Sequence, residues 1–113
     1  MSGRHDGRTL AVQFLFQRDF NDGDLEEALK QFWLDQDATT KVRAFAEELI
    51  RGVEQHRAAL DAQLQKCAEH WDVKRMGGVD RNVMRVALFE MLHRPDIPPV
   101  VSINEAVDLA KEL

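Results

Sequence analysis

Two residue types that bind transition metals lie close together in the sequence, at Cys67 and His70. A spacing of three positions places them one turn apart on a helix. A zinc site needs three or four such ligands, and the remaining histidines, His5, His56 and His93, are not in ligand spacing with this pair. We therefore interpret Cys67 as a small buried hydrophobic residue beside a surface histidine, and we expect no metal ion.

Sequence motifs for catalysis are also missing. The chain has no GxSxG, no Walker loop and no dinucleotide-binding glycine pattern. Gly77-Gly78 lacks the Gly-Lys-Ser/Thr continuation that would give it a role in phosphate binding. We expect a protein that is not an enzyme and that needs no cofactor.

Polar residues interrupt two apolar segments. Glu90 lies within residues 83–92, which are almost all apolar, and a buried carboxylate is costly unless it is satisfied. Asn104 and Glu105 raise the same question in the following segment. We predict a structural clasp between helices, in which Asn104, a nearby arginine or a backbone N–H satisfies Glu90.

Basic residues gather at two places where they could contact phosphates. The two groups are Arg4, His5 and Arg8 near the N-terminus, and Lys74, Arg75, Arg81 and Arg85 around the Gly-Gly pair. Each group alone is typical of a solvated face. Together they indicate a binding surface only if the fold brings them to one side.

Composition and length indicate a single globular domain spanning residues 1–113, with 44% hydrophobic and 31% charged residues. No apolar run is long enough to cross a membrane, no signal peptide is visible, and the single cysteine allows no internal disulfide, so we expect a cytoplasmic protein. The net charge of −5 argues against non-specific coating of nucleic acid. Net positive charge is confined to residues 1–20 and 71–94, so RNA binding would have to be local.

Helical periodicity runs through the chain without strand alternation, which predicts an all-α bundle. The six expected helices lie near residues 8–20, 24–35, 40–55, 57–71, 80–94 and 99–113. The expected N-caps are Asp24, Thr39 or Thr40, and Asp80, and the last helix starts at a proline or at Ser102.

The first helix carries two apolar stripes rather than one. The stripes are Leu10, Ala11, Phe14 and Leu15 on one side, and Val12, Phe16 and Phe20 on the other. A second stripe indicates a helix that is buried on two sides or that keeps one face for a partner. The expected core face of the last helix is Ile103, Ala106, Val107 and Ala110.

Several segments resemble the NusB family of bacterial transcription antitermination factors. WDVKRMGGVDRNVMRVALFEML is similar to the family segment W-x-x-x-R-x-x-x-V-D-R-x-x-x-R-x-A-x-x-E-L, and IPPVVSINEAVDLAKEL is similar to P-x-x-V-x-I-N-E-A-V-x-L-A-K. GRTLAVQFLFQRDF resembles the opening helix, R-x-x-A-x-Q-x-L-Y. The resemblance covers essentially the whole chain in order.

This resemblance implies two small helical subdomains packed together and a function without catalysis. It implies binding of BoxA-type RNA in ribosomal RNA leaders, together with a NusE-type ribosomal protein of the small subunit. The complex would attach to the RNA polymerase elongation complex and promote read-through of terminators.

The resemblance also assigns roles to individual residues. Arg4, His5 and Arg8 match the RNA-binding arm, and we expect Arg81 to be a further RNA contact because it lies next to Asp80, where the two surfaces meet. Phe16, Phe20 and Asp80 match the positions that bind the partner protein, which explains the second stripe of the first helix.

The family's last helix, with its F-V-N-G-x-L motif, has no match here, and we expect a chain that is truncated at its C-terminus. Val107, Ala110 and Leu113 would then face the position of that helix, and the exposed apolar surface would favour a homodimer. Two alternatives remain open. One is a protein-interaction module of the same fold with weak or no RNA binding, and the other is an RNA-binding domain related to ribosomal RNA methyltransferases.

Overall fold

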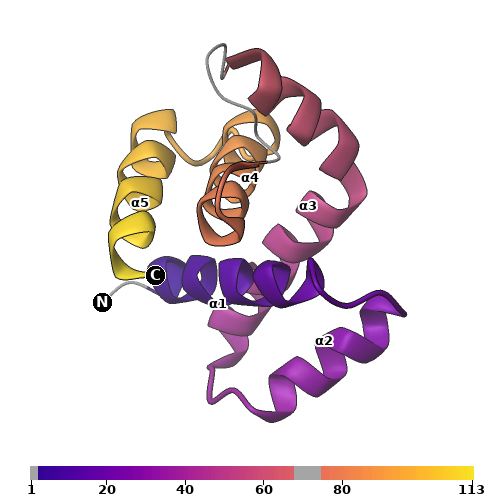
Figure 1. Cartoon of the computed structure of the whole chain (residues 1–113). Coiled ribbons are helices and arrows are strands. Elements are labelled where there is room, and N and C mark those ends of the chain that lie inside the picture. The colour runs from indigo at the N-terminus through magenta and orange to yellow at the C-terminus, as the bar shows by residue number, and fades with distance from the viewer. Residues whose placement is uncertain (1–2, 68–74) are drawn as a thin grey trace.

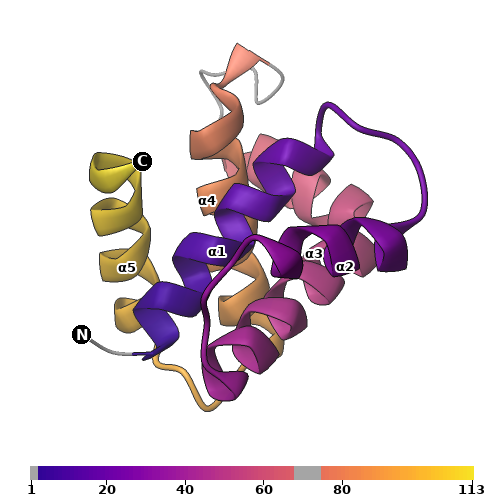
Figure 2. The same ribbon diagram turned by 90° about the horizontal axis from the view of Figure 1, so that it is seen from below.

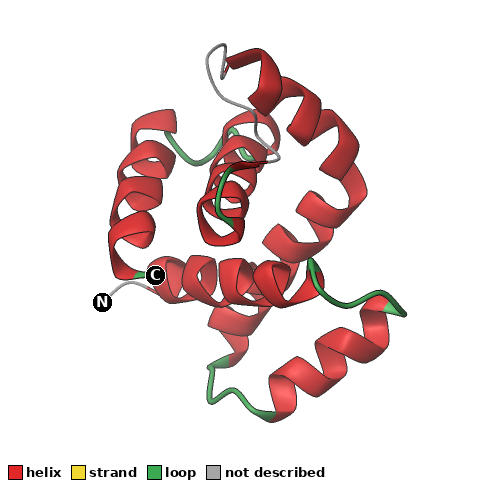
Figure 3. Ribbon diagram, in the orientation of Figure 1, coloured by secondary structure: helices red, strands yellow, loops and turns green. Residues whose placement is uncertain are grey.

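The computed structural model describes residues 3–67 and 75–113, and these residues form helices joined by short loops (Figure 1, Figure 3). The helices are α1 (Gly3–Arg18), α2 (Leu25–Leu34), α3 (Thr40–Cys67), α4 (Gly78–His93) and α5 (Pro99–Glu112). The predicted all-α class is confirmed. No helix in the described part of the chain is long and apolar enough to cross a membrane.

Local capping chemistry explains where several helices begin. The carboxylate of Asp24 accepts a hydrogen bond from the backbone N–H of Glu27, as predicted for α2. Thr39 caps α3 through the N–H of Val42, and Pro99 occupies the first position of α5. Asp80 is not an N-cap, because α4 already begins at Gly78 and Asp80 lies in its first turn, where a carboxylate favours the helix dipole.

The middle of the chain differs from the prediction. The helices expected at 40–55 and 57–71 are one continuous helix, α3, as far as Cys67; residues 68–71 lie outside the described part. Neither proline nor glycine separates residue 55 from 57, so nothing ends the helix there. Cys67 is exposed rather than buried, because it lies at the end of α3.

The long α3 connects the two ends of the bundle. In Figure 1, α4 lies between α3 and α5, while α1 crosses beneath them. Figure 2, seen from below, places α2 alongside α1 and α3. The edge of the Phe14 ring meets Phe32 of α2, with ring centroids 5.3 Å apart. Further along, Leu64 of α3 packs with Met84 and Leu88 of α4.

The buried face of α5 is rotated from the one expected, although Ala106 packs against the core as predicted. Ser102 and Leu109 are buried, whereas the side chains of Ile103 and Val107 are 51% and 49% exposed. Ser102 lies on the inward side, where its hydroxyl donates to the buried Glu90 carboxylate at 3.0 Å, and the next residue, Ile103, faces solvent. Val107 and Leu113 lie at the surface in the described structure.

Close packing of α3 against α4 depends on the absence of a side chain at Gly52. A methyl group added there would overlap the ring of Phe89. We expect Gly52→Ala to lower the free energy of unfolding by about 1–3 kcal/mol, since overpacking outweighs the gain in helix propensity. Urea unfolding of Gly52→Ala, of Phe89→Leu and of the double variant Gly52→Ala/Phe89→Leu provides the check. Leucine at position 89 removes the ring and should relieve the overlap, so losses of unfolding free energy that simply add in the double variant would contradict this packing.

Candidate nucleic-acid and partner interface

An aromatic pair lies at the end of α1, where the chain leaves the bundle. The rings of Phe16 and Phe20 meet edge to face, with centroids 5.2 Å apart. The side chain of Phe20 is 74% exposed, so one face of the pair is open to solvent. Phe16 also packs over Gly78, where an added Cβ would lie 3.0 Å from the ring. The first turn of α4, with the exposed Asp80, is therefore brought beside the aromatic pair.

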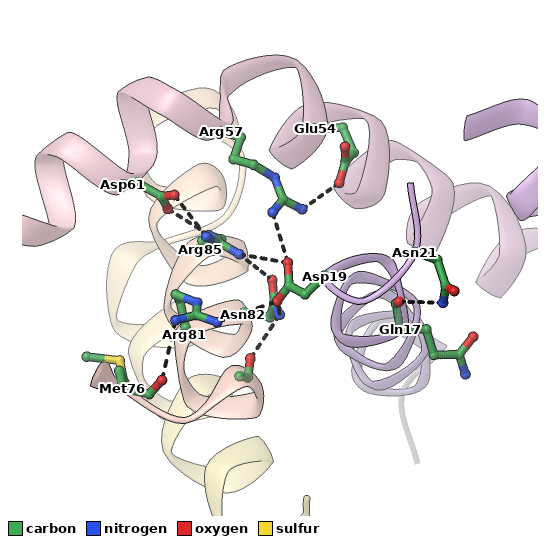
Figure 4. Close-up of polar contacts among 11 residues, drawn as sticks. Gln17, Asp19, Asn21, Glu54, Arg57, Asp61, Met76, Arg81, Asn82 and Arg85 are labelled. Atoms are coloured by element: carbon green, nitrogen blue, oxygen red, sulfur yellow. Dashed lines mark hydrogen bonds and ion pairs between the residues drawn. The ribbon is translucent and has the colours of Figure 1, made fainter. Parts of the chain in front are cut away.

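Asp19, just beyond the last residue of α1, fixes this junction (Figure 4). Its carboxylate accepts hydrogen bonds from Arg57 of α3 at 2.9 Å and from Asn82 of α4 at 2.8 Å. Burial alone would raise the pKa of Asp19, but the bonds from Arg57 and Asn82 outweigh it and hold that pKa below its ordinary value. Asp19 stays charged and joins three helices at one point.

Arg85 continues the same network toward α3. Its guanidinium donates to both oxygens of Asp61, at 2.7 and 2.8 Å, and to the side-chain oxygen of Asn82 at 3.0 Å. The side chain of Arg85 is only 6% exposed, so it connects α3 and α4 inside the bundle and is not a surface cation. Arg75 is exposed, and Lys74 lies outside the described residues.

Arg81 sits at the edge of this network and remains partly accessible. Its guanidinium lies 3.8 Å from the Asp19 carboxylate and donates to the backbone oxygen of Met76 at 3.4 Å. Its side chain is 21% exposed. The Asp19 carboxylate thus contacts the candidate RNA contact Arg81, and it lies next in sequence to the candidate partner contact Phe20. Sequence reasoning missed Asp19, whose only signal was its place between two stripe residues.

Arg8 is in the interior, contrary to the prediction that it belongs to a surface arm. Its guanidinium forms a two-bond contact with Glu90, at 2.8 and 2.7 Å, and Ser102 donates to the same carboxylate at 3.0 Å. Arg8 and Glu90 are 2% and 1% exposed. Of the partners predicted for Glu90, an arginine is the one found, whereas Asn104 is exposed and takes no part in these bonds. Because Arg8 is buried and its guanidinium is bonded to Glu90, it is not available to contact RNA.

The other two residues of the expected arm lie in the first turns of α1 rather than in a flexible tail. Arg4 is half-exposed, lies over the ring of Phe45 and is 3.6 Å from Asp96. The ring of His5 contacts Glu105 at 2.7 Å through Nδ1 and Glu112 at 3.0 Å through Nε2. Glu105 is also 3.8 Å from Arg8, so it borders the buried pair instead of satisfying Glu90.

The two basic groups therefore lie at opposite ends of α1. Arg4 and His5 are at its start, and Arg81 is beside Asp19 at its end. A helix rises about 1.5 Å per residue, which separates the two places by roughly 20 Å along the axis. Among the described residues, no cluster of three or more metal-binding side chains occurs.

The buried pair generates a prediction about stability. Glu90→Ala should lower the free energy of unfolding by about 3–5 kcal/mol, because it leaves the Arg8 charge buried and unpaired. Urea unfolding measures this loss. Replacing both partners with apolar residues, as in Arg8→Met/Glu90→Leu, should recover most of it. A Glu90→Ala protein as stable as the natural chain, but defective in ligand binding, would contradict the structural role.

His5 generates a prediction about pH. Its hydrogen bond with Glu105, followed by the contact with Glu112, raises the pKa of His5 above the ordinary 6.5 despite the opposing effect of burial. The raised folded-state pKa means that His5 stabilises the protein fully below pH 6.5, and that this contribution is lost as pH rises through the folded-state pKa.

Urea unfolding across neutral pH tests this linkage, with His5→Gln as the comparison. The natural chain should lose stability upward from pH 6.5 relative to the variant. Parallel pH profiles for the two proteins would show that the contacts of His5 do not stabilise the fold.

Comparison with known proteins assigns this chain to a family. Residues 5–113 match the NusB family. The transcription antitermination protein NusB of Desulforapulum autotrophicum is 43% identical, with the alignment covering 98% of this chain and 79% of that protein. Its counterpart in Myxococcus xanthus is 40% identical, covering 98% and 82%.

Solved structures agree with the sequence comparison. Thermotoga maritima NusB superposes with a TM-score of 0.85 at 36% identity, covering 96% of this chain and 77% of that one. The NusB chain solved with NusE and double-stranded RNA shares the fold, with a TM-score of 0.85 at 23% identity and coverage of 99% and 83%. The match over nearly all of its length, together with relatives at about 40% identity, shows that this chain belongs to the NusB family.

Proposed function

We propose that this protein is a non-enzymatic transcription antitermination factor. It binds BoxA-type RNA of ribosomal RNA leaders together with a NusE-type ribosomal protein, and it promotes read-through by RNA polymerase. The observation that carries the proposal is the match of residues 5–113 to the NusB family, whose relatives at about 40% identity are transcription antitermination proteins.

The partner surface in this proposal is the end of α1 with the first turn of α4. Phe20, exposed and packed edge to face on the half-buried Phe16, supplies an aromatic anchor, which is the kind of side chain that dominates binding energy at interfaces. Asp80 adds a charge at the rim. The Asp19 network supports this assignment, because it holds the anchor and the rim together before any partner arrives.

The RNA surface in this proposal uses Arg81 near the partner and Arg4 and His5 at the start of α1. Because the whole chain carries a net charge of −5, these few cations must act locally and the partner must add to the affinity. Two observations favour one other candidate, a protein-interaction module with weak or no RNA binding. Arg8 is buried, and Arg4 and His5 each lie beside a carboxylate of the protein itself.

Titration of a BoxA-type RNA separates the two candidates. For the antitermination factor, RNA affinity should rise when the NusE-type partner is present and fall as salt increases, by about 0.7 in logarithmic slope for each single-stranded phosphate contact. RNA binding that is absent at every partner concentration, alongside intact partner binding, would establish the interaction module instead.

Substitutions test the two surfaces separately. Phe20→Ala should weaken partner binding by about 1–2 kcal/mol or more, because it removes an exposed aromatic anchor without disturbing the core. Leu34→Ala, which removes a side chain that is 71% exposed on α2, is the matched control and should leave binding unchanged. Calorimetry with the purified partner gives both affinities; equal losses in the two variants would remove the aromatic pair from the interface.

Arg81→Ala should have the opposite selectivity. The affinity of the partner complex for RNA should fall, while partner binding stays intact, because Arg81 faces the junction from α4 and its charge is partly accessible. Fluorescence anisotropy with labelled RNA measures the change. Unaltered RNA affinity at low salt would exclude Arg81 as a contact.

A further inference from the structure

The cations at the start of α1 face carboxylates from the C-terminal third of the chain. Arg4 is 3.6 Å from Asp96, in the loop before α5. His5 contacts Glu105 at 2.7 Å and Glu112 at 3.0 Å, both on α5. Each group proposed to meet an RNA phosphate at this end is therefore already beside an anion of the protein itself.

His5 is the clearest case, because both of its ring nitrogens are engaged. A neutral imidazole has only one N–H donor, so contact with two carboxylates requires the doubly protonated ring. A phosphate oxygen would need one of the same two N–H groups. The N–H group of His5 that contacts Glu112 therefore cannot bind an RNA phosphate at the same time.

The two carboxylates differ in how readily they could give way. Glu105 has 22% of its side chain exposed and also lies near the buried Arg8, so it belongs to the interior of the α1 and α5 junction. Glu112 is 51% exposed and lies in the last turn of α5. A carboxylate at a helix C-terminus opposes the helix dipole, and end turns open easily, so Glu112 is the exchangeable contact.

The docking of α5 is consistent with such an exchange. Its buried side chains are Ser102 and Leu109, which lie ten and three residues before Glu112, so a rotation of the Glu112 side chain requires neither of them to move. Displacement of Glu112 from His5 therefore leaves the apolar contacts of α5 in place. At the same time, the positive end of the α1 dipole favours an anion near His5, whether a carboxylate or a phosphate.

We propose that Glu112 is an internal competitor of RNA phosphate, which occupies His5 in the free protein and lowers its affinity for RNA. The inference rests on the proposed function, since it concerns the same RNA surface. It adds an autoinhibitory contact. The Glu112 carboxylate of α5 covers His5 at the start of α1, and RNA must displace that carboxylate to reach the imidazolium.

The test measures RNA affinity of Glu112→Gln in the presence of the NusE-type partner. The amide keeps the size of the side chain and removes its charge, so affinity should rise about two- to five-fold, as expected for release of one exposed ion pair. Asp108→Asn is the matched control. Asp108 is exposed on the same helix, is not one of the carboxylates at His5, and its substitution changes the net charge equally.

A double-mutant cycle with His5→Gln then asks whether Glu112 acts through the histidine. If it does, Glu112→Gln should give no gain beyond that of Asp108→Asn in the His5→Gln background. Thermal unfolding of every variant shows that the compared proteins are folded. The two charge-removing variants have equal effects if only the overall field matters, and that result would overturn the inference.

The outcomes also separate this inference from the function on which it rests. RNA binding by the natural chain, with equal affinities for Glu112→Gln and Asp108→Asn, removes the competitor and leaves the antitermination function intact. A gain that persists in full without His5 does the same. Failure of every protein to bind RNA with its partner present removes the proposed function, and the competitor with it.

Discussion

Arg8 of α1 and Glu90 of α4 are buried together, and each charge would be prohibitively costly to bury without the other. Two parallel hydrogen bonds fix their geometry, and Ser102 of α5 supplies a third donor to the same carboxylate. Three helices from the two ends of the chain are thereby held in one register. The rotation of α5 follows from this contact, because the helix must turn Ser102 inward and consequently presents Ile103 to solvent.

The opposite end of α1 is organised by a second carboxylate with a different purpose. Asp19 is less buried than Glu90 and gathers donors from α3 and α4 around the place where α1 ends. This network leaves Phe20 exposed and Arg81 partly accessible. One polar centre therefore stabilises the bundle, and the other arranges the surface that we assign to the partner and to RNA.

An acidic protein that binds RNA must control where its few cations are available. Here several arginines form ion pairs with carboxylates inside the protein. The cations at the start of α1 are likewise paired with carboxylates of α5 and of the loop before it. This arrangement limits non-specific attraction to nucleic acid and leaves recognition to the few cations that remain accessible. Competition within the protein for those cations would be the natural consequence of such a charge distribution.

The amino-acid sequence by itself determined the class of fold, most helix boundaries and the family. Apolar periodicity, the cap at Asp24 and the proline at the start of α5 are local signals, so they can be recognised without knowledge of the tertiary structure. The expected break between residues 55 and 57 was wrong, because no proline or glycine lies there to end the helix.

The tertiary structure decided which charges are buried. Arg8 looks like a surface cation in the sequence, and only the arrival of Glu90 from 82 positions away makes its burial tolerable. The same holds for Asp19, whose donors come from α3 and α4, and for His5, whose carboxylates come from α5. Electrostatic partners in a helical bundle are set by packing between helices, and no spacing along one helix encodes them.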